Sequence, residues 1–108
     1  MVDSQQRTEM DEYWNGLGGT KWIENLSLIE RVFAPISEIL IDSLSQERKM
    51  KVLEVGCGGA ALAAKLAKLI GPEGEVTASD ISRPILDVAQ KNHTKIPNLD
   101  FLCADVEL

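Results

Sequence analysis

Three glycines in a short stretch form the part of the sequence best suited to holding a ligand. Gly56, Gly58 and Gly59 lie between a β-branched run, residues 51–55, and a segment rich in helix-forming residues. Glycine tolerates the backbone angles of a sharp turn and lets a ligand approach the main chain closely. Where a strand gives way to a helix, such a loop lies at the edge of an α/β sheet that binds ligands. A plain tight turn is the alternative that this pattern leaves open.

Asp80 is the second residue with chemical potential. It ends another β-rich run, residues 75–79, and follows Gly58 by about twenty residues, which is the spacing of a ribose-binding acid. If the two runs are neighbouring parallel strands, Asp80 lies beside the glycine loop. Its carboxylate could there accept two hydrogen bonds from a ribose diol. Taken alone, an aspartate before Ser82 would fit a turn or a helix cap better.

Glu54 discriminates between two classes of ribose-containing ligand. The pattern Gly56-x-Gly58-x-x-Ala61 satisfies the loose fingerprint of dinucleotide-binding loops. A dinucleotide would place its pyrophosphate next to Glu54, where a second negative charge is unfavourable. A ligand that presents an ammonium group would instead be stabilised there. We therefore favour an ammonium-bearing ligand and keep a nicotinamide dinucleotide (NAD) as the less favoured alternative.

The elements that must position these residues alternate between strands and helices after residue 50. Ser82 fits the cap of the second helix, and Pro84 suits its first turn. Such alternation indicates parallel strands joined by right-handed crossovers, in the spatial order 3-2-1. The predicted fold class is α/β, a Rossmann-like β-α-β-α-β unit with a parallel three-stranded half-sheet. Its predicted strands and helices cover, in chain order, residues 51–55, 60–70, 75–79, 82–93 and 99–103.

The residues before this unit predict a helical arm. Residues 1–22 are polar, with two tryptophans and a glycine cluster, and are expected to be irregular or partly helical. Over residues 25–44 apolar side chains recur every three or four positions, which is helical spacing. Pro35 interrupts this run, so a kink or a junction of two helices is expected there. The predicted division is an N-terminal arm, 1–49, and a partial Rossmann-like unit, 50–108.

Composition and charge limit the kind of partner. The chain has 108 residues, with 11 lysines and arginines against 17 aspartates and glutamates, so its net charge is −6. This balance argues against nucleic acid or an anionic membrane surface as the main partner. No apolar run approaches the length of a membrane-spanning helix, and the polar N-terminus lacks the features of a secretory signal.

The two cysteines, Cys57 and Cys103, are too few and too scattered for a disulfide scaffold or a zinc site. The second predicted strand would hold the first and third about 9.5 Å apart, beyond the reach of a disulfide. Free thiols and a cytoplasmic location are therefore expected. Cys57 is expected to pack in the glycine turn, although a helix start could lower its pKa. The single histidine, His93, is expected to cap a helix, and no metal site is predicted.

Three segments in register resemble the class I S-adenosylmethionine-dependent methyltransferases: VLEVGCGGA, VTASDIS and FLCADVEL. The arm segment DEYWNGLGGTKWIENLSLIERVFAPI is similar to the N-terminal region of bacterial small-molecule methyltransferases of the ubiquinone and menaquinone biosynthesis type. The resemblance covers nearly the whole chain. It implies S-adenosylmethionine as cofactor and transfer of its methyl group to a small-molecule acceptor. Catalytic residues are left unassigned, because the sulfonium is already activated and alignment supplies much of the rate.

The resemblance also implies roles for individual residues along the cofactor. Glu54 would lie near its methionine ammonium group, directly or through water. Gly56 and Gly58 would let the backbone approach the methionyl and ribose portions. Asp80 would hold the ribose hydroxyls, and Ile81 would pack on the adenine.

Further roles are implied at the adenine ring and in the arm. Asp105 would accept from the adenine amino group, and the backbone N–H of Val106 would face the ring. By itself, Asp105 could equally be a solvated residue. Trp14 and Trp22 would either cover the cofactor or anchor the arm through burial.

Two departures from the family pattern carry consequences. Ala60 stands where the family usually has a third glycine, so its Cβ is expected to crowd the cofactor or the contact between helix and strand. The family fold has seven strands, so this sequence, with three, is interpreted as truncated. The outer edge of the first strand, 52–55, would then be unpaired and apolar. We expect a homodimer, a higher homo-oligomer or a partner chain to cover it. A non-catalytic module that self-associates through this edge is the alternative to an enzyme.

Overall fold

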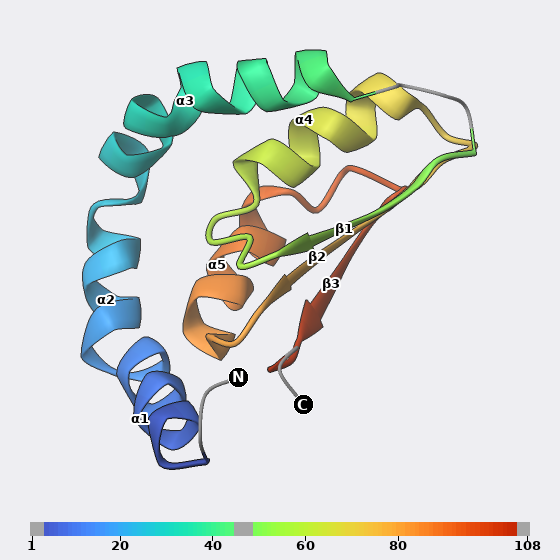
Figure 1. Cartoon of the computed structure of the whole chain (residues 1–108). Coiled ribbons are helices and arrows are strands. Elements are labelled where there is room, and N and C mark those ends of the chain that lie inside the picture. Colours follow the sequence, from blue (N-terminus) through green and yellow to red (C-terminus); the bar gives the residue numbers. More distant parts are fainter. Residues whose placement is uncertain (1–3, 45–48, 106–108) are drawn as a thin grey trace.

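The computed structural model describes residues 4–44 and 49–105, which form one parallel sheet, two crossover helices and a long helical arm (Figure 1). The strands β1 (Lys51–Val55), β2 (Glu75–Asp80) and β3 (Leu99–Cys103) are parallel and lie in the order β1-β2-β3. The predicted α/β fold, the parallel pairing and the spatial order are confirmed.

The carboxyl ends of the strands meet at one edge of the sheet. Val55, the last residue of β1, pairs with Ser79, and Asp80, the last residue of β2, pairs with Cys103. The backbone N–H of Cys57 continues this contact beyond β1 by donating to the carbonyl oxygen of Ser79 at 2.9 Å. The register therefore places the loop after β1 directly beside the end of β2.

The two crossover helices, α4 (Ala61–Ile70) and α5 (Arg83–Asn92), cover one face of the sheet (Figure 1). Both begin and end within one residue of their predicted bounds. Small side chains on α4 allow it to pack closely, and Gly71, at φ +87°, ends it. The core that joins these helices to the sheet contains Ala60, Ala63, Ala64, Leu66, Ala67, Ile70, Val76, Ala78, Ala89 and Leu99.

The opposite face of the sheet is open within the described ranges. Leu53, Val55 and Leu102 are 57%, 57% and 48% exposed, although strand residues of this type are normally buried. β1 also forms one edge of the sheet, and no described strand pairs with its outer side. The apolar edge predicted for the first strand is therefore present in the structure. We refer to Leu53, Val55 and Leu102 below as the open sheet face.

The arm consists of α1 (Ser4–Asn15), α2 (Leu17–Glu24) and α3 (Leu26–Ser43). It is more helical than predicted, since α1 and α2 fill most of a segment expected to be irregular or partly helical. The prediction that two helices could meet at Pro35 is wrong, because α3 is continuous through it. The ribbon of α3 bends along its length (Figure 1), as a lost backbone donor allows. Burial of Leu26 and Ile41, near its two ends, helps to hold the helix together.

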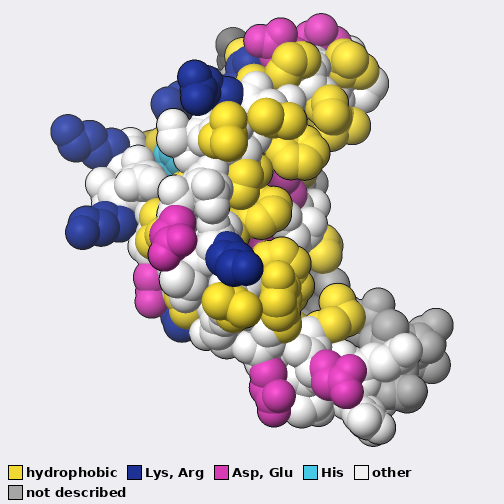
Figure 2. Space-filling model, turned by 90° about the vertical axis from the view of Figure 1, so that its left-hand side faces the viewer, with side chains coloured by type: hydrophobic (Ala, Val, Ile, Leu, Met, Phe, Trp, Pro, Cys, Tyr) yellow, Lys and Arg dark blue, Asp and Glu magenta, His cyan; other side chains and the backbone are white. Residues whose placement is uncertain are grey.

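Most of the apolar side chains of α3 remain exposed. Figure 2 shows hydrophobic side chains gathered along one side of the molecule. None of the helices in the described ranges is long and apolar enough to cross a membrane. The exposed apolar residues of α3 are Leu28, Val32, Phe33, Ile36, Ile39 and Leu40.

Three hydrogen bonds fasten the arm to the loop between β2 and α5. The hydroxyl of Ser82 donates to the carbonyl oxygen of Trp14 at 2.6 Å. The side-chain amide of Asn15 donates to the carbonyl oxygen of Ile81 at 3.1 Å and accepts from the backbone N–H of Arg83 at 2.9 Å. These contacts hold the C-terminal end of α1 above the end of β2. The division of the chain at residue 49 stays a prediction.

Replacing Ser82 by alanine is expected to lower the free energy of unfolding by about 2 kcal/mol, because the hydroxyl serves both partners at once. It is fully buried, accepts from the backbone N–H of Ile85 as the cap of α5, and donates to Trp14. Urea denaturation measures the change. Ser43→Ala is the matched control, since this exposed hydroxyl donates to Leu40 within its own helix, and a shift below about 0.5 kcal/mol is expected. Equal effects of the two changes would contradict the role of Ser82.

Candidate functional site

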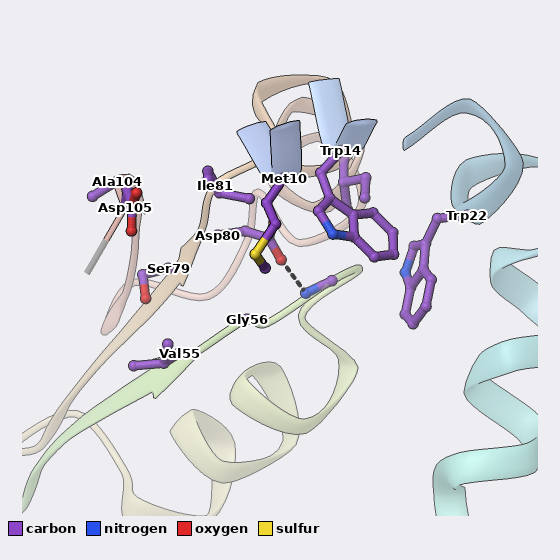
Figure 3. Close-up of a pocket in the computed structure, with 12 residues that line it drawn as sticks. Met10, Trp14, Trp22, Val55, Gly56, Ser79, Asp80, Ile81, Ala104 and Asp105 are labelled. Atoms are coloured by element: carbon purple, nitrogen blue, oxygen red, sulfur yellow. Dashed lines mark hydrogen bonds between the residues drawn. The ribbon is translucent and has the colours of Figure 1, made fainter. Parts of the chain in front are cut away.

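A cavity of about 340 Å³ opens at the carboxyl ends of the strands, beneath the arm (Figure 3). Five of the seven predicted binding residues line it, although they come from three separate loops. These five are Gly56, Gly58, Asp80, Ile81 and Asp105. The cavity is otherwise lined by Met10, Trp14, Trp22, Val55, Ser79, Ile85 and Ala104. We call it the first cavity.

Asp80 ties the loops around the first cavity together. One carboxylate oxygen accepts from the backbone N–H of Gly58 at 3.0 Å, the dashed line in Figure 3, and the other accepts from Ser82 at 2.9 Å. The sequence left open a turn aspartate or a ribose-binding one, and these bonds show the turn role. Each carboxylate oxygen has a second lone pair, so Asp80 retains the capacity to accept from a diol in the cavity.

The glycine loop adopts the left-handed backbone conformation that favours glycine. Gly56 has φ +72°, and a Cβ built there would meet nothing within 4 Å. Gly58 has φ +55°, and a Cβ there would lie 3.0 Å from the indole nitrogen of Trp22. The first glycine thus keeps the wall of the cavity open, and the second makes room for the arm.

Ala60, which replaces the third glycine of the family pattern, also has a positive φ, +65°. Its side chain is fully buried in the core between α4 and the sheet and lines neither cavity described here. Of the two contacts that its Cβ was expected to crowd, the structure places it at the one between helix and strand. What remains is the strain of a left-handed alanine, about 1–2 kcal/mol.

Glu54 faces a second cavity, of about 260 Å³, which lies between α3 and the start of α4. Trp22 and Gly56 line both cavities, so the two adjoin at these residues. One carboxylate oxygen of Glu54, Oε1, is buried and has no hydrogen-bond partner in the described part of the chain. Burial raises the pKa of Glu54 to about 7. A hydrogen bond from the Ala63 backbone lowers this pKa, and the negative charge of Asp80 has a smaller effect that raises it.

The two tryptophans lie against one another above the glycine loop. The rings of Trp14 and Trp22 pack edge to face, with centroids 5.8 Å apart, and Tyr13 packs on Trp14 at 5.1 Å in the same manner. Both tryptophans point toward the first cavity (Figure 3). The indole nitrogen of Trp22 is buried without a hydrogen-bond partner among the described residues. Each of the two roles left open, cover and anchor, thus fits the observed positions.

The remaining predictions concern Val106, the two cysteines and His93. Val106 lies outside the described residues. Cys57 and Cys103 are both free, as expected. The alternative of a lowered thiol pKa at Cys57 is wrong, because burial first, and then the charges of Asp80 and Glu54, raise its pKa to about 12. His93 caps the C-terminus of α5, as expected, and its Nε2 also lies 3.2 Å from the carbonyl oxygen of Gly59.

Sequence reasoning missed Met10 and Ser79. Met10 lines the first cavity from α1, one helical turn before Trp14, and this spacing was the only signal that could have found it. Ser79 is buried, and its hydroxyl donates to the carbonyl oxygen of Glu54 at 2.9 Å. This bond links the ends of β1 and β2, so Ser79 supports the position of Glu54.

The polar groups of the two cavities fit a ligand with a ribose and an amino-acid end. Asp80 lines the first cavity and offers acceptor capacity for hydroxyl groups. Glu54 and Trp22 offer a buried acceptor and a buried donor next to it, both unsatisfied within the described residues. Gly56, at the junction of the cavities, leaves space for a ligand that passes from one to the other.

Comparisons with known proteins show the family to which the chain belongs. A family model described as a methyltransferase domain matches residues 52–108. The chain is 34% identical over 120 aligned positions to a ubiquinone biosynthesis O-methyltransferase of Coxiella burnetii, covering all of this chain and 47% of the relative. It is 29% identical over 89 positions to a malonyl-[acyl-carrier protein] O-methyltransferase of Ilyobacter polytropus, covering 82% of this chain and 32% of the relative.

A solved structure shows the same fold. Magnesium protoporphyrin IX methyltransferase from Synechocystis PCC 6803, with bound SAH, superposes with a TM-score of 0.69 at 18% identity, over 92% of this chain and 51% of that one. The chain thus spans about a third to a half of the length of these three proteins. Because the family model matches more than half of its residues, the chain belongs to the methyltransferase-domain family, as its resemblance to the class I S-adenosylmethionine-dependent methyltransferases predicted.

Proposed function

We propose that this chain binds S-adenosylmethionine and forms the cofactor-binding part of a methyltransferase that acts on a small-molecule acceptor. The observation that carries the proposal is the pair of adjoining cavities, with Asp80 in one, Glu54 in the other and Gly56 between them. The two relatives described above are both O-methyltransferases, which supports an acceptor oxygen. Two free thiols are compatible with a reducing cytoplasm.

Each of the predicted residues has a part in this proposal. Asp80 accepts from the ribose hydroxyls, and Glu54 accepts from the ammonium group of the amino-acid end. Ile81 packs on the adenine and Asp105 accepts from its amino group, whereas the contact predicted for Val106 lies outside the described residues. When bound, the cofactor supplies a methyl group already activated by its sulfonium. The residues of this chain therefore have to hold and orient it and exclude water.

A nicotinamide dinucleotide remains the less favoured ligand. Its pyrophosphate would lie near Glu54 and Asp80, and the negative charge of Asp80 already disfavours ionisation of Glu54. Calorimetric titration with S-adenosylhomocysteine, with NAD as competitor, tests the choice. Saturable binding that NAD does not reverse is expected. The absence of binding by a folded sample, or displacement by NAD, would overturn the proposal.

Replacing Gly56 by alanine should weaken S-adenosylhomocysteine binding in addition to lowering the stability of the fold. The positive φ makes any side chain cost about 1–2 kcal/mol of stability, and the new methyl group would stand in the open wall between the cavities. Gly71→Ala is the matched control: φ there is also positive, nothing lies within 4 Å, and the residue lines neither cavity. Calorimetry should show at least a tenfold loss of affinity for Gly56→Ala alone. Equal affinities of the two variants would contradict the position assigned to the ligand.

We further propose that two copies of the chain associate through β1 and the open sheet face. An unpaired strand edge next to exposed Leu53 and Val55 is a template for a second strand. Sedimentation velocity tests this, with Leu53→Lys as the variant. A dimer that dissociates in the variant is expected. A monomer in the unsubstituted protein at micromolar concentration would contradict the proposal and would also remove the basis for the alternative function, a non-catalytic module that self-associates.

A further inference from the structure

Two buried polar atoms beside the glycine loop lack a hydrogen-bond partner in the described residues. They are the indole nitrogen of Trp22, Nε1, and one carboxylate oxygen of Glu54, Oε1. The indole N–H can only donate a hydrogen bond, and an ionised carboxylate can only accept one. A buried polar atom without a partner destabilises a fold, so two complementary ones near a cavity indicate a ligand that satisfies both.

Trp22 lies where the two cavities adjoin. A Cβ on Gly58 would lie 3.0 Å from Nε1, so the indole N–H lies against the glycine loop. Trp22 and Gly56 line both cavities, whereas Glu54 lines only the second. The edge-to-face contact with Trp14 holds the Trp22 ring over the first cavity (Figure 3). A ligand that extends from Asp80 past Gly56 therefore meets the indole donor and then the Glu54 acceptor.

The group that would satisfy both atoms is a zwitterion. We propose that Trp22 binds the carboxylate of the amino-acid end of S-adenosylmethionine through its indole N–H, while Glu54 binds the ammonium group of the same end. No lysine, arginine or histidine of the described ranges lines either cavity, so the carboxylate has no cationic partner there and depends on neutral donors. This assignment rests on the proposed function. It makes Trp22 a binding residue in addition to those predicted from the sequence.

The test uses three ligands that differ only at the amino-acid end. S-adenosylhomocysteine carries both the carboxylate and the amine, its decarboxylated analogue keeps the amine alone, and methylthioadenosine has neither. Calorimetry should show that wild-type protein binds the decarboxylated analogue about tenfold more weakly than S-adenosylhomocysteine. Trp22→Phe keeps an aromatic ring and removes the N–H. It should bind S-adenosylhomocysteine about tenfold more weakly than wild type and bind the other two ligands unchanged.

Two matched variants make the test specific. Trp14→Phe removes the other indole N–H in the first cavity and should leave the ratio between the three ligands unchanged. Glu30→Gln removes the other carboxylate of the second cavity and should do the same, whereas Glu54→Gln should weaken only the two ligands that carry the amine.

The outcomes separate the inference from the proposed function. If Trp22→Phe weakens all three ligands equally, Trp22 has a structural role and the inference is overturned. If wild-type protein binds S-adenosylhomocysteine and its decarboxylated analogue equally, no donor recognises the carboxylate and the inference is again overturned. If folded wild-type protein binds none of the three, the proposed function itself fails, and the assignment of Trp22 fails with it.

Discussion

Replacing Asp80 by alanine is expected to weaken the binding of S-adenosylhomocysteine by at least a hundredfold. The carboxylate would lose two charge-assisted hydrogen bonds from the ribose hydroxyls, each worth about 1.5–3 kcal/mol. The substitution would also leave the backbone N–H groups of Gly58 and Ser82 without their acceptor, which loosens both walls of the first cavity. Calorimetric titration at constant salt concentration measures the affinity, and thermal melting shows whether the variant is still folded.

Two comparisons make the Asp80 result interpretable. Asp100→Ala removes an exposed carboxylate of β3 that lines neither cavity and should leave the affinity unchanged. Asp80→Asn keeps one acceptor oxygen for the glycine loop and should lose less affinity than Asp80→Ala. If Asp80→Ala instead binds as tightly as wild-type protein, the role of this carboxylate is confined to the turn that it forms with Gly58 and Ser82.

Glu54→Gln is expected to stabilise the chain at pH 8 by up to about 3 kcal/mol and to change little at pH 4. Burial raises the pKa of Glu54 from 4.5 to about 7. Between pH 4.5 and about 7 the native state binds more protons than the unfolded state. The contribution of Glu54 to the free energy of unfolding therefore falls as the pH rises. Above about pH 7 the full penalty of a buried charge is present. Glutamine carries no charge at any pH and does not incur this penalty.

Urea denaturation at pH 4, 5, 6, 7 and 8 measures the difference between variant and wild type, which cancels the titration of all other groups. Glu73→Gln serves as control, since this exposed glutamate lies outside both cavities. Saturating S-adenosylhomocysteine should reduce the stability difference between Glu54→Gln and wild type at pH 8, because the ammonium group of the ligand would stabilise the wild-type carboxylate. A difference that does not vary with pH would show that Glu54 is already solvated in the native state.

The sheet and its two crossover helices could be predicted from the sequence because local signals coincide there. Apolar β-branched runs end at glycine or at Asp80, and Ser82 with Pro84 begins a helix, so each boundary is marked by the residue that causes it. At Pro35 the local signal allowed a kink or a junction of two helices and could not decide between them. The loss of one backbone donor bends α3, but the packing of its two ends keeps it continuous.

The site was predictable only in part. Gly56, Gly58 and Asp80 lie together because parallel neighbouring strands require it, and this follows from the order of the elements. The separation of Glu54 into a second cavity depends on where α3 crosses α4, which no local pattern specifies. The bonds from Asn15 and Ser82 join residues more than sixty positions apart and satisfy backbone groups of an irregular loop. Such contacts arise from tertiary packing, so the sequence carried no signal for them.

The open sheet face also affects how the chain responds to temperature. Leu53, Val55 and Leu102 are about half exposed in the native chain, so unfolding hydrates less new apolar surface than it would for a sheet covered on both faces. The heat-capacity change of unfolding should therefore lie below the usual value of about 12–15 cal/mol/K per residue. A small heat-capacity change flattens the curve of stability against temperature, and the native state then loses little stability on cooling. If two copies associate through this face, dissociation of the dimer hydrates this apolar surface and contributes the remaining heat-capacity change. Calorimetry at two protein concentrations would reveal this contribution.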